Sequence, residues 1–152
     1  MNDLIHVSSF YSDTAGQERY RSISRIYFRG ASIALLCFDV TDRKSYESCT
    51  RWLQDLKLLT SDCIIVASGN KIDLVQQRQV SYDEAQKYFS STIPPIPYFE
   101  TSSKTKEGLN ELFENAAKMF IESRTSSSSS PHPQHDPVEP PSTPSQSWCV
   151  IW

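Results

Sequence analysis

The chain has 152 residues and a formal net charge of −3, with 22% charged residues, so it has room for one domain and no strongly basic face. Proteins that grip the phosphates of a nucleic acid need such a face, and we therefore expect no nucleic-acid partner. The four cysteines show no Cys-x-x-Cys spacing and only three histidines accompany them, which argues against a zinc site and against a disulfide framework. There is no signal peptide and no long apolar span, so we expect a cytosolic chain that does not cross a membrane.

The composition predicts four parts. Residues 1–12 contain alternating apolar residues that are compatible with a strand, and residues 13–124 mix apolar runs with charge as a globular domain does. Residues 125–148 are rich in Ser and Pro and have almost nothing to bury, which predicts a disordered, partly polyproline-II tether. Residues 149–152 form a short apolar end.

Three apolar runs predict strands of a parallel sheet that is buried on both faces: residues 33–40, 63–67 and 98–101. Helical patterns follow each run. Residues 45–59 carry one apolar stripe, and Ser81 with Glu84 forms a capping box that begins a helix ending near Ser90. The closing helix has apolar residues at the 3.6-residue period: Leu109, Leu112, Phe113, Ala116 and Phe120. This alternation is typical of right-handed βαβ units, and the predicted fold class is α/β with a doubly wound, mainly parallel sheet and flanking helices.

Two polar motifs follow predicted strands, where open α/β sheets bind their ligands. Residues 70–73 read Asn-Lys-Ile-Asp, directly after the 63–67 run. Asp73 can accept from both N1–H and the 2-amino group of guanine, a donor pair that adenine lacks. Asn70 can join neighbouring loops and approach the N7/O6 edge, while the stem of Lys71 lies over the ring. The alternative is an ordinary polar turn.

The second motif follows the 98–101 run and contains Ser102, Ser103 and Lys104. There the backbone N–H of Ser103 would donate to the guanine carbonyl. The alternative is a plain serine-rich loop, and these residues alone do not decide between the two.

A third motif, Asp-Thr-Ala-Gly-Gln, occupies residues 13–17. Asp13 can contact a phosphate-bound Mg²⁺ through water, Gly16 offers an N–H to a γ-phosphate with no Cβ in the way, and Gln17 can orient an attacking water. The alternative is a glycine turn before a helix. The nucleotide interpretation is favoured because the motif continues without a gap into residues 18–24.

On these residues the chain resembles the small GTPases of the Rab family, from about residue 13 to 121. Five segments carry the resemblance: Tyr20-Arg-Ser-Ile-Ser24, Tyr27-Phe-Arg-Gly-Ala31, Leu36-Cys-Phe-Asp-Val-Thr41, Asn70-Lys-Ile-Asp73 and Glu100-Thr-Ser-Ser-Lys-Thr105. The resemblance implies a P-loop GTPase-type, Rossmann-like fold, GTP or GDP with Mg²⁺ as ligands, and hydrolysis of GTP to GDP and phosphate with Gln17 on the water. It also implies a switch of vesicle trafficking, with Tyr20 and Tyr27 on the effector surface and with effectors, an exchange factor and escort proteins as partners.

One part of the family pattern has no counterpart here, because no Gly-x-x-x-x-Gly-Lys-[Ser/Thr] motif occurs. The family's first strand, phosphate loop, first helix and switch I are missing with it. That strand lies centrally in the family's sheet, between the strand before Asp13 and the 33–40 strand. We therefore expect these two strands to keep unpaired edges or to pair directly in a new register. Either outcome predicts a marginally stable or partner-dependent domain that is poorly soluble or molten when isolated. Because phosphate contacts supply much of the affinity in this class of site, we also expect no tight GTP or GDP binding.

The end of the chain, Cys149-Val-Ile-Trp152, has the Cys-aliphatic-aliphatic-X form of a prenylation box. The alternative is a chance apolar tail. Prenylation would place the protein on the cytosolic face of endomembranes. Residues 125–152 contain no Lys or Arg, so a single lipid chain there predicts weak, reversible attachment.

Three hypotheses stay open at this point. The chain is a Rab-type GTPase, a lipid-tethered Rab-like binding module without nucleotide, or an incomplete gene model or splice product. Titration with a fluorescent guanine nucleotide separates the first two, and sequencing of the 5′ end of the transcript decides the third.

Overall fold

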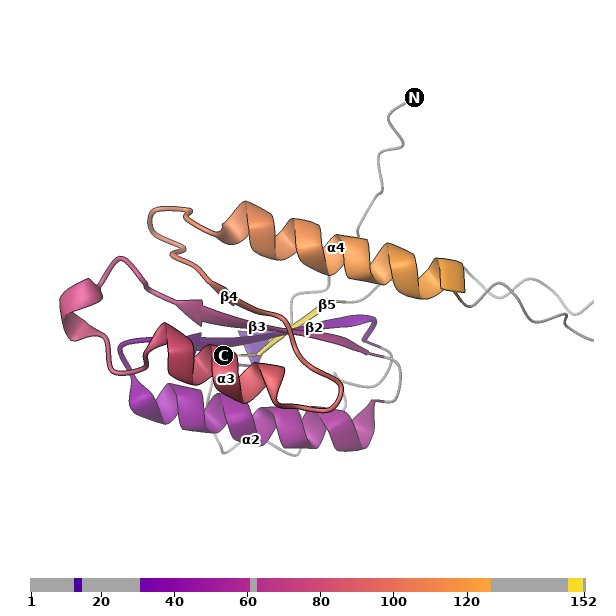
Figure 1. Cartoon of the computed structure of the whole chain (residues 1–152), viewed down its shortest axis with the longest axis horizontal. Coiled ribbons are helices and arrows are strands. Elements are labelled where there is room, and N and C mark those ends of the chain that lie inside the picture. The colour runs from indigo at the N-terminus through magenta and orange to yellow at the C-terminus, as the bar shows by residue number, and fades with distance from the viewer. Residues whose placement is uncertain (1–12, 15–30, 61–62, 127–147, 152) are drawn as a thin grey trace, which may run out of the picture.

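The computed structural model describes residues 13–14, 31–60, 63–126 and 148–151. These residues form a parallel sheet of strand order β1-β5-β2-β3-β4. Helices α2 and α3 cover one face and α4 covers the other (Figure 1). The elements in chain order are β1 (Asp13–Thr14), β2 (Ile33–Asp39), α2 (Arg43–Leu59), β3 (Ile64–Asn70), the 3₁₀ turn η2 (Val75–Gln77), α3 (Tyr82–Ser90), β4 (Tyr98–Glu100), α4 (Leu109–Ser126) and β5 (Trp148–Ile151).

The predicted α/β fold class is confirmed, and the three predicted strands are present as β2, β3 and β4. β3 continues three residues beyond the predicted end, through Ser68 and Gly69 to Asn70, because these residues pair in register with Cys37, Phe38 and Asp39 of β2. Asn70 is thus both the last residue of a central strand and the first residue of the predicted base-reading motif.

The helices begin at capping residues. α2 begins two residues earlier than predicted because Asp42 is its N-cap, with the side chain accepting from the backbone N–H of Lys44 at 2.9 Å. Ser81 caps α3 as predicted and accepts from the N–H of Glu84 at 3.2 Å. The carboxylate of Glu84 forms an ion pair with Arg43 at 2.6 Å, so it joins α3 to the start of α2.

The buried side chains form two clusters, one on each face of the sheet. On the α2 and α3 face, alternate residues of β2 pack with apolar residues of both helices, and Phe38 and Phe89 are the largest side chains with almost no exposure to solvent. On the α4 face, Ile33, Leu35 and Cys37 pack with Leu112 and Ala116. The predicted stripe of α4 is thus partly confirmed, while Phe113 is 39% exposed because it lies beside the stripe.

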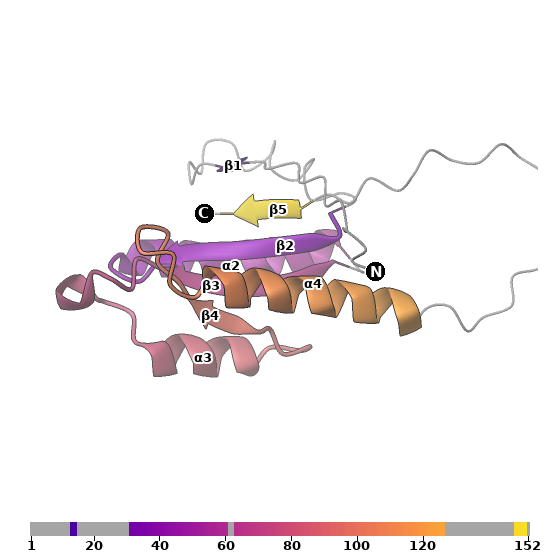
Figure 2. The same ribbon diagram turned by 90° about the horizontal axis from the view of Figure 1, so that it is seen from above.

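The centre of the sheet differs from the expectation. We expected the strand before Asp13 and the 33–40 strand to keep unpaired edges or to pair directly. The structure shows instead that β5 lies between β1, at Asp13–Thr14, and β2 (Figure 2). β5 pairs with β2 from Ile33↔Trp148 to Leu36↔Ile151, and with β1 through Asp13↔Val150 and Thr14↔Ile151. The C-terminal residues therefore occupy the position where the resemblance places the family's first strand.

The predicted N-terminal segment, 1–12, lies outside the described residues. Most of the predicted tether also does: its first two residues belong to α4, its last, Trp148, belongs to β5, and the 21 residues 127–147 are not described. Among the helices of the described ranges, none has the length and apolar character that a membrane crossing requires.

Candidate functional site

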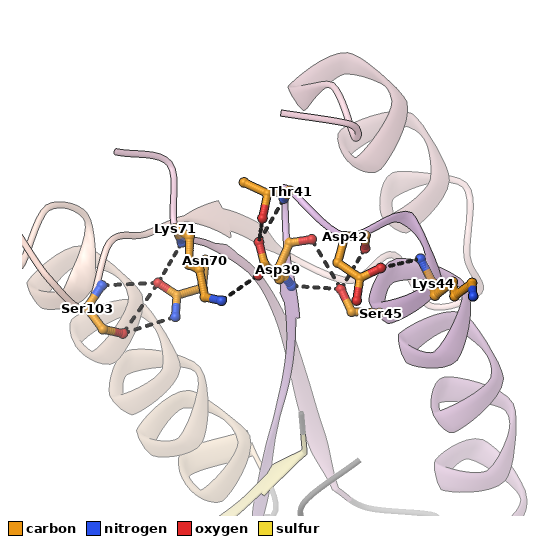
Figure 3. Close-up of polar contacts among 8 residues, drawn as sticks. All are labelled: Asp39, Thr41, Asp42, Lys44, Ser45, Asn70, Lys71 and Ser103. Carbon is orange, nitrogen blue, oxygen red and sulfur yellow. Dashed lines mark hydrogen bonds and ion pairs between the residues drawn. The ribbon is translucent and has the colours of Figure 1, made fainter. Parts of the chain in front are cut away.

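The candidate site lies where β2, β3 and β4 end. Asp39 closes β2, Asn70 closes β3, and the loop at residues 101–108 follows β4. All three strands run in the same direction, so their carboxyl ends and the loops that follow meet at one edge of the sheet. Figure 3 shows the side chains of Asp39, Asn70, Lys71 and Ser103 gathered there.

Asn70 joins the two predicted base-reading loops. Its Oδ1 accepts from the backbone N–H groups of Lys71 at 2.8 Å and Ser103 at 3.0 Å, and its Nδ2 donates to the Ser103 Oγ at 3.1 Å. The residue is 4% exposed, so loss of these bonds would leave polar groups unsatisfied in a place with little water. The predicted linking role of Asn70 is seen in this geometry. The N–H of Ser103, which we expected to serve guanine, has Asn70 as its partner in the structure.

Asp73 is held from the opposite loop. The Ser102 Oγ donates to Asp73 Oδ1 at 2.6 Å, and Ser102 itself is completely buried. The loop closes on Ser102, whose N–H donates to the Glu107 carbonyl at 3.0 Å and whose carbonyl accepts from Lys106 at 2.7 Å. The Asp73 carboxylate is therefore fixed in orientation by a residue 29 positions away in the chain.

Lys71 is positioned by a residue that the sequence analysis did not include in the site. Its Nζ lies 2.6 Å from Asp39 Oδ2, and its backbone has a φ of 66°. Asp39 Oδ1 accepts from the N–H and the Oγ1 of Thr41 at 2.7 and 2.6 Å. A carboxylate at the end of an apolar strand, on the edge where ligands bind, was the signal available for Asp39.

The ion pair of Asp39 with Lys71 predicts how the stability of the fold depends on pH. Burial raises the pKa of Asp39, but hydrogen bonds from Lys71 and Thr41 and the charge of Lys71 outweigh it, so the pKa lies below its ordinary value. A carboxyl with a depressed folded-state pKa stabilises the fold fully above its unfolded value of about 3.9, and this stabilisation is lost as the pH falls through the folded-state pKa.

We therefore expect Asp39→Asn to melt below the wild type at pH 7, with the difference shrinking as the pH falls below about 4. Asparagine keeps the acceptor for Thr41 and removes only the charge that faces Lys71. Melting temperatures at pH 7 and pH 3 measure the effect, and Asp83→Asn, on the exposed side of α3, is the matched control. A constant difference between wild type and Asp39→Asn at both pH values would contradict the prediction.

A partly buried ion pair between Arg78 and Glu100 connects the two loops of the site. Arg78, after η2, forms a two-bond contact with Glu100 at the end of β4, with N···O distances of 2.6 and 2.9 Å. Tyr98 donates to the same carboxylate at 3.1 Å, and burial raises the pKa of Tyr98, so its hydroxyl stays protonated. These bonds hold the loop after residue 73 against the strand that leads into residues 101–104.

The structure brings together four of the predicted residues, Asn70, Asp73, Ser102 and Ser103, with Lys71 beside them on Asp39. Lys104 is exposed on the same loop. Asp13 lies in β1 and Cys149 in β5. The remaining predicted site residues lie outside the described residues: Gly16, Gln17, Tyr20 and Tyr27. Within the described ranges, no three His, Cys, Asp or Glu side chains are placed to hold a metal ion.

Comparison with known proteins gives consistent matches. A sequence model of the Ras family matches residues 6–122. The chain is similar to the human Ras-related protein Rab-4A, with 41% identity over 110 residues, covering 72% of this chain and 50% of that protein. It is similar to two Dictyostelium discoideum proteins. The Ras-related protein Rab-2B is 43% identical over 110 residues, covering 72% of this chain and 54% of that protein. The putative ras-related protein Rab-5B is 40% identical over 121 residues, covering 79% and 56%. The chain thus spans about half the length of the curated relatives it matches.

Proposed function

This chain belongs to the Ras family and is a Rab-like small GTPase by homology, and from this we propose that its 70–73 and 101–104 loops bind the base of GTP or GDP. The observation that carries the proposal is the pairing of these loops by Asn70–Ser103 and Asp73–Ser102 contacts. They hold the Asp73 carboxylate against the 101–104 loop at the ligand-binding edge of a parallel sheet.

The donor and acceptor pattern fits guanine. Within the described residues, Ser102 is the hydrogen-bond partner of the Asp73 carboxylate, and a carboxylate has about four acceptor sites, so capacity remains for two further N–H groups. Guanine presents N1–H and a 2-amino group side by side, whereas adenine does not. Bonds of this kind to a charged acceptor are worth about 1.5–3 kcal/mol each, which is enough to discriminate between the two bases.

We expect the contacts of this chain with the phosphates of a nucleotide to be weaker than those of a GTPase with a phosphate loop. The sequence of 152 residues contains no Gly-x-x-x-x-Gly-Lys-[Ser/Thr] motif. A loop with this motif supplies the N–H groups and the lysine that hold β- and γ-phosphates. When bound, Mg²⁺ would neutralise charge on these phosphates, with Asp13 as its indirect contact by resemblance. We propose that this chain recognises guanine through its base and that its GTP hydrolysis is impaired.

A nucleotide titration tests both parts of the proposal. Titration of the 152-residue chain with a fluorescent GDP is expected to give a Kd weaker than about 1 µM, with GDP favoured over ADP. Asp73→Ala is expected to reduce GDP affinity at least about tenfold, because it removes charge-assisted bonds to the base. Asp83→Ala, an exposed aspartate on α3, is the matched control and should bind as the wild type does.

The two parts fail separately. A Kd below 1 µM for the wild type would contradict the proposal that phosphate binding is impaired, and would favour a functional GTPase. Equal affinity for GDP and ADP, or no difference between Asp73→Ala and Asp83→Ala, would contradict base recognition.

A second candidate is a Rab-like binding module that works without nucleotide. It is favoured by the way the site's polar groups satisfy one another: Asn70 bonds to Ser103, Asp73 to Ser102, and Asp39 to Lys71. Such a module would compete for the partners of Rab proteins, namely effectors, exchange factors or escort proteins. No nucleotide binding at millimolar GDP, with the fold intact, would favour this candidate.

We further propose membrane attachment through prenylation of Cys149, which would place the protein on the cytosolic face of endomembranes and in vesicle trafficking. The form Cys-Val-Ile-Trp of residues 149–152 supports it. One isoprenoid without a basic segment gives only reversible attachment.

A further inference from the structure

The strand position between β1 and β2 is occupied by β5, which comes from the C-terminal residues of the same chain. β5 is parallel to both neighbours and pairs with four consecutive residues of β2 and with both residues of β1. A strand in the interior of a sheet satisfies its backbone donors and acceptors on two sides, whereas a sheet with this strand removed would leave the β2 edge open.

The residues on both sides of the β2–β5 pairing suit a buried strand. Ile33, Ala34, Leu35 and Leu36, which pair with β5, are all apolar and no more than 2% exposed. The sequence of β5, Trp-Cys-Val-Ile, is apolar and contains two β-branched residues and an aromatic one, the types enriched in strands. An open β2 edge with this composition would be a site for aggregation, so a strand from the same chain has a clear stabilising role.

The connection permits this docking. A parallel strand needs a long crossover connection, and 21 residues, 127–147, separate α4 from β5. Extended, they span up to about 70 Å. Figure 2 shows that α4 ends near the same end of the sheet at which β5 begins.

We propose that residues 148–151 are a releasable strand: docked, they complete the sheet between β1 and β2, and only when released can Cys149 be prenylated. The second half rests on the lipidation proposed above. Prenylation forms a thioether between Cys149 Sγ and C1 of an isoprenyl diphosphate, breaks the C–O bond to the diphosphate leaving group, and releases the thiol proton. A transferase must hold the last four residues in its own active site, and a backbone paired on both sides within a sheet is not available for that.

Hydrogen exchange of the unmodified 152-residue chain tests the docking. The amides of residues 149–151 are expected to exchange at least about tenfold more slowly than those of the same sequence in a free peptide of residues 139–152. Exchange at the peptide's rate would overturn the proposal. Val150→Pro removes a ladder donor, and we expect the amides of residues 33–36 to exchange faster in that variant, while Ser145→Pro, which adds the same residue upstream of β5, leaves them unchanged. If Val150→Pro does not fold, the wild-type measurement decides.

Prenylation kinetics test the exclusion. A CaaX prenyltransferase with its isoprenyl diphosphate should modify the folded chain more slowly than the free peptide. Because only the released fraction reacts, the slowing should match the protection factor of β5, at least about tenfold. Equal rates would overturn the exclusion. If the free peptide is not modified either, the lipidation proposal and the exclusion fail together, while strand docking is judged by exchange alone.

Discussion

Replacing Phe38 by alanine is expected to lower the free energy of unfolding by about 3–5 kcal/mol. Phe38 is 1% exposed near the carboxyl end of β2. Its ring centroid lies 5.0 Å from that of Tyr46 on α2, 6.0 Å from that of Tyr98 on β4 and 6.4 Å from that of Phe89 on α3. One ring therefore joins two helices to a neighbouring strand, and truncation to alanine leaves a cavity that several elements cannot fill together.

This loss is large compared with a typical domain stability of about 5–15 kcal/mol. Phe113→Ala, at a position that is 39% exposed on α4, removes the same side chain and should cost less than about 1 kcal/mol. Urea unfolding of both variants followed by circular dichroism measures the difference. Similar losses for the two variants would contradict the packing described here.

The same substitution is expected to reach the candidate site. Tyr98 stacks on Phe38 with an interplanar angle of 10° and donates its hydroxyl to Glu100, which holds Arg78. A cavity beside Tyr98 would loosen this chain of contacts under the 101–104 loop. We therefore expect stability and the proposed guanine recognition to be coupled through an aromatic cluster that contains no predicted nucleotide contact.

The fold could largely be predicted from local patterns. Continuous apolar runs located β2 and most of β3, and the 3.6-residue stripe located α2, because burial on both faces or on one stripe leaves a direct signature in the sequence. The capping box located the start of α3. The end of β3 was missed because Gly69 and Asn70 are poor strand formers by themselves. Pairing with β2 overrides that preference, and pairing is a property of the assembled sheet.

β5 could not be predicted in this way. Residues 148–151 follow a Ser/Pro-rich segment and read as a lipidation signal, and four apolar residues show no periodicity that separates a strand from an exposed tail. What makes them a strand is the edge of β2 and the backbone of β1, more than 100 residues away in sequence. Such a long-range partner is not visible in the local sequence.

For the candidate site, sequence position was informative and side-chain partners were not. The positions of the 70–73 and 101–104 loops after adjacent strands placed them side by side, but the Asn70 side chain as the partner of the Ser103 N–H was not predicted. The ion pair of Lys71 with Asp39 was not predicted. Lys71 also has a positive φ, a backbone conformation that is uncommon for residues other than glycine and that the motif does not indicate. At the end of the 101–108 loop, Gly108 also has a positive φ, and this residue determines the path of the chain there.

Gly108→Ala is expected to destabilise the fold by at least about 2 kcal/mol. Gly108 has a φ of 70°, a left-handed conformation that costs other residues about 1–2 kcal/mol. A Cβ at this position would also overlap the backbone carbonyl of Glu100, which cannot move aside as a flexible side chain does. The added methyl must therefore push the start of α4 away from the end of β4.

The neighbouring Lys106 provides the control, because it has a φ of 68° in the same loop but carries a side chain. Lys106→Gly relieves the left-handed strain and should leave stability unchanged or raise it by up to about 1 kcal/mol. Denaturant unfolding of the two variants should thus give shifts of opposite sign or a shift for Gly108→Ala alone. If Gly108→Ala were as stable as the wild type, the close approach of this loop to Glu100 would be wrong. The placement of Ser102 and Ser103 against Asp73 and Asn70, which depends on that loop, would then be in doubt as well.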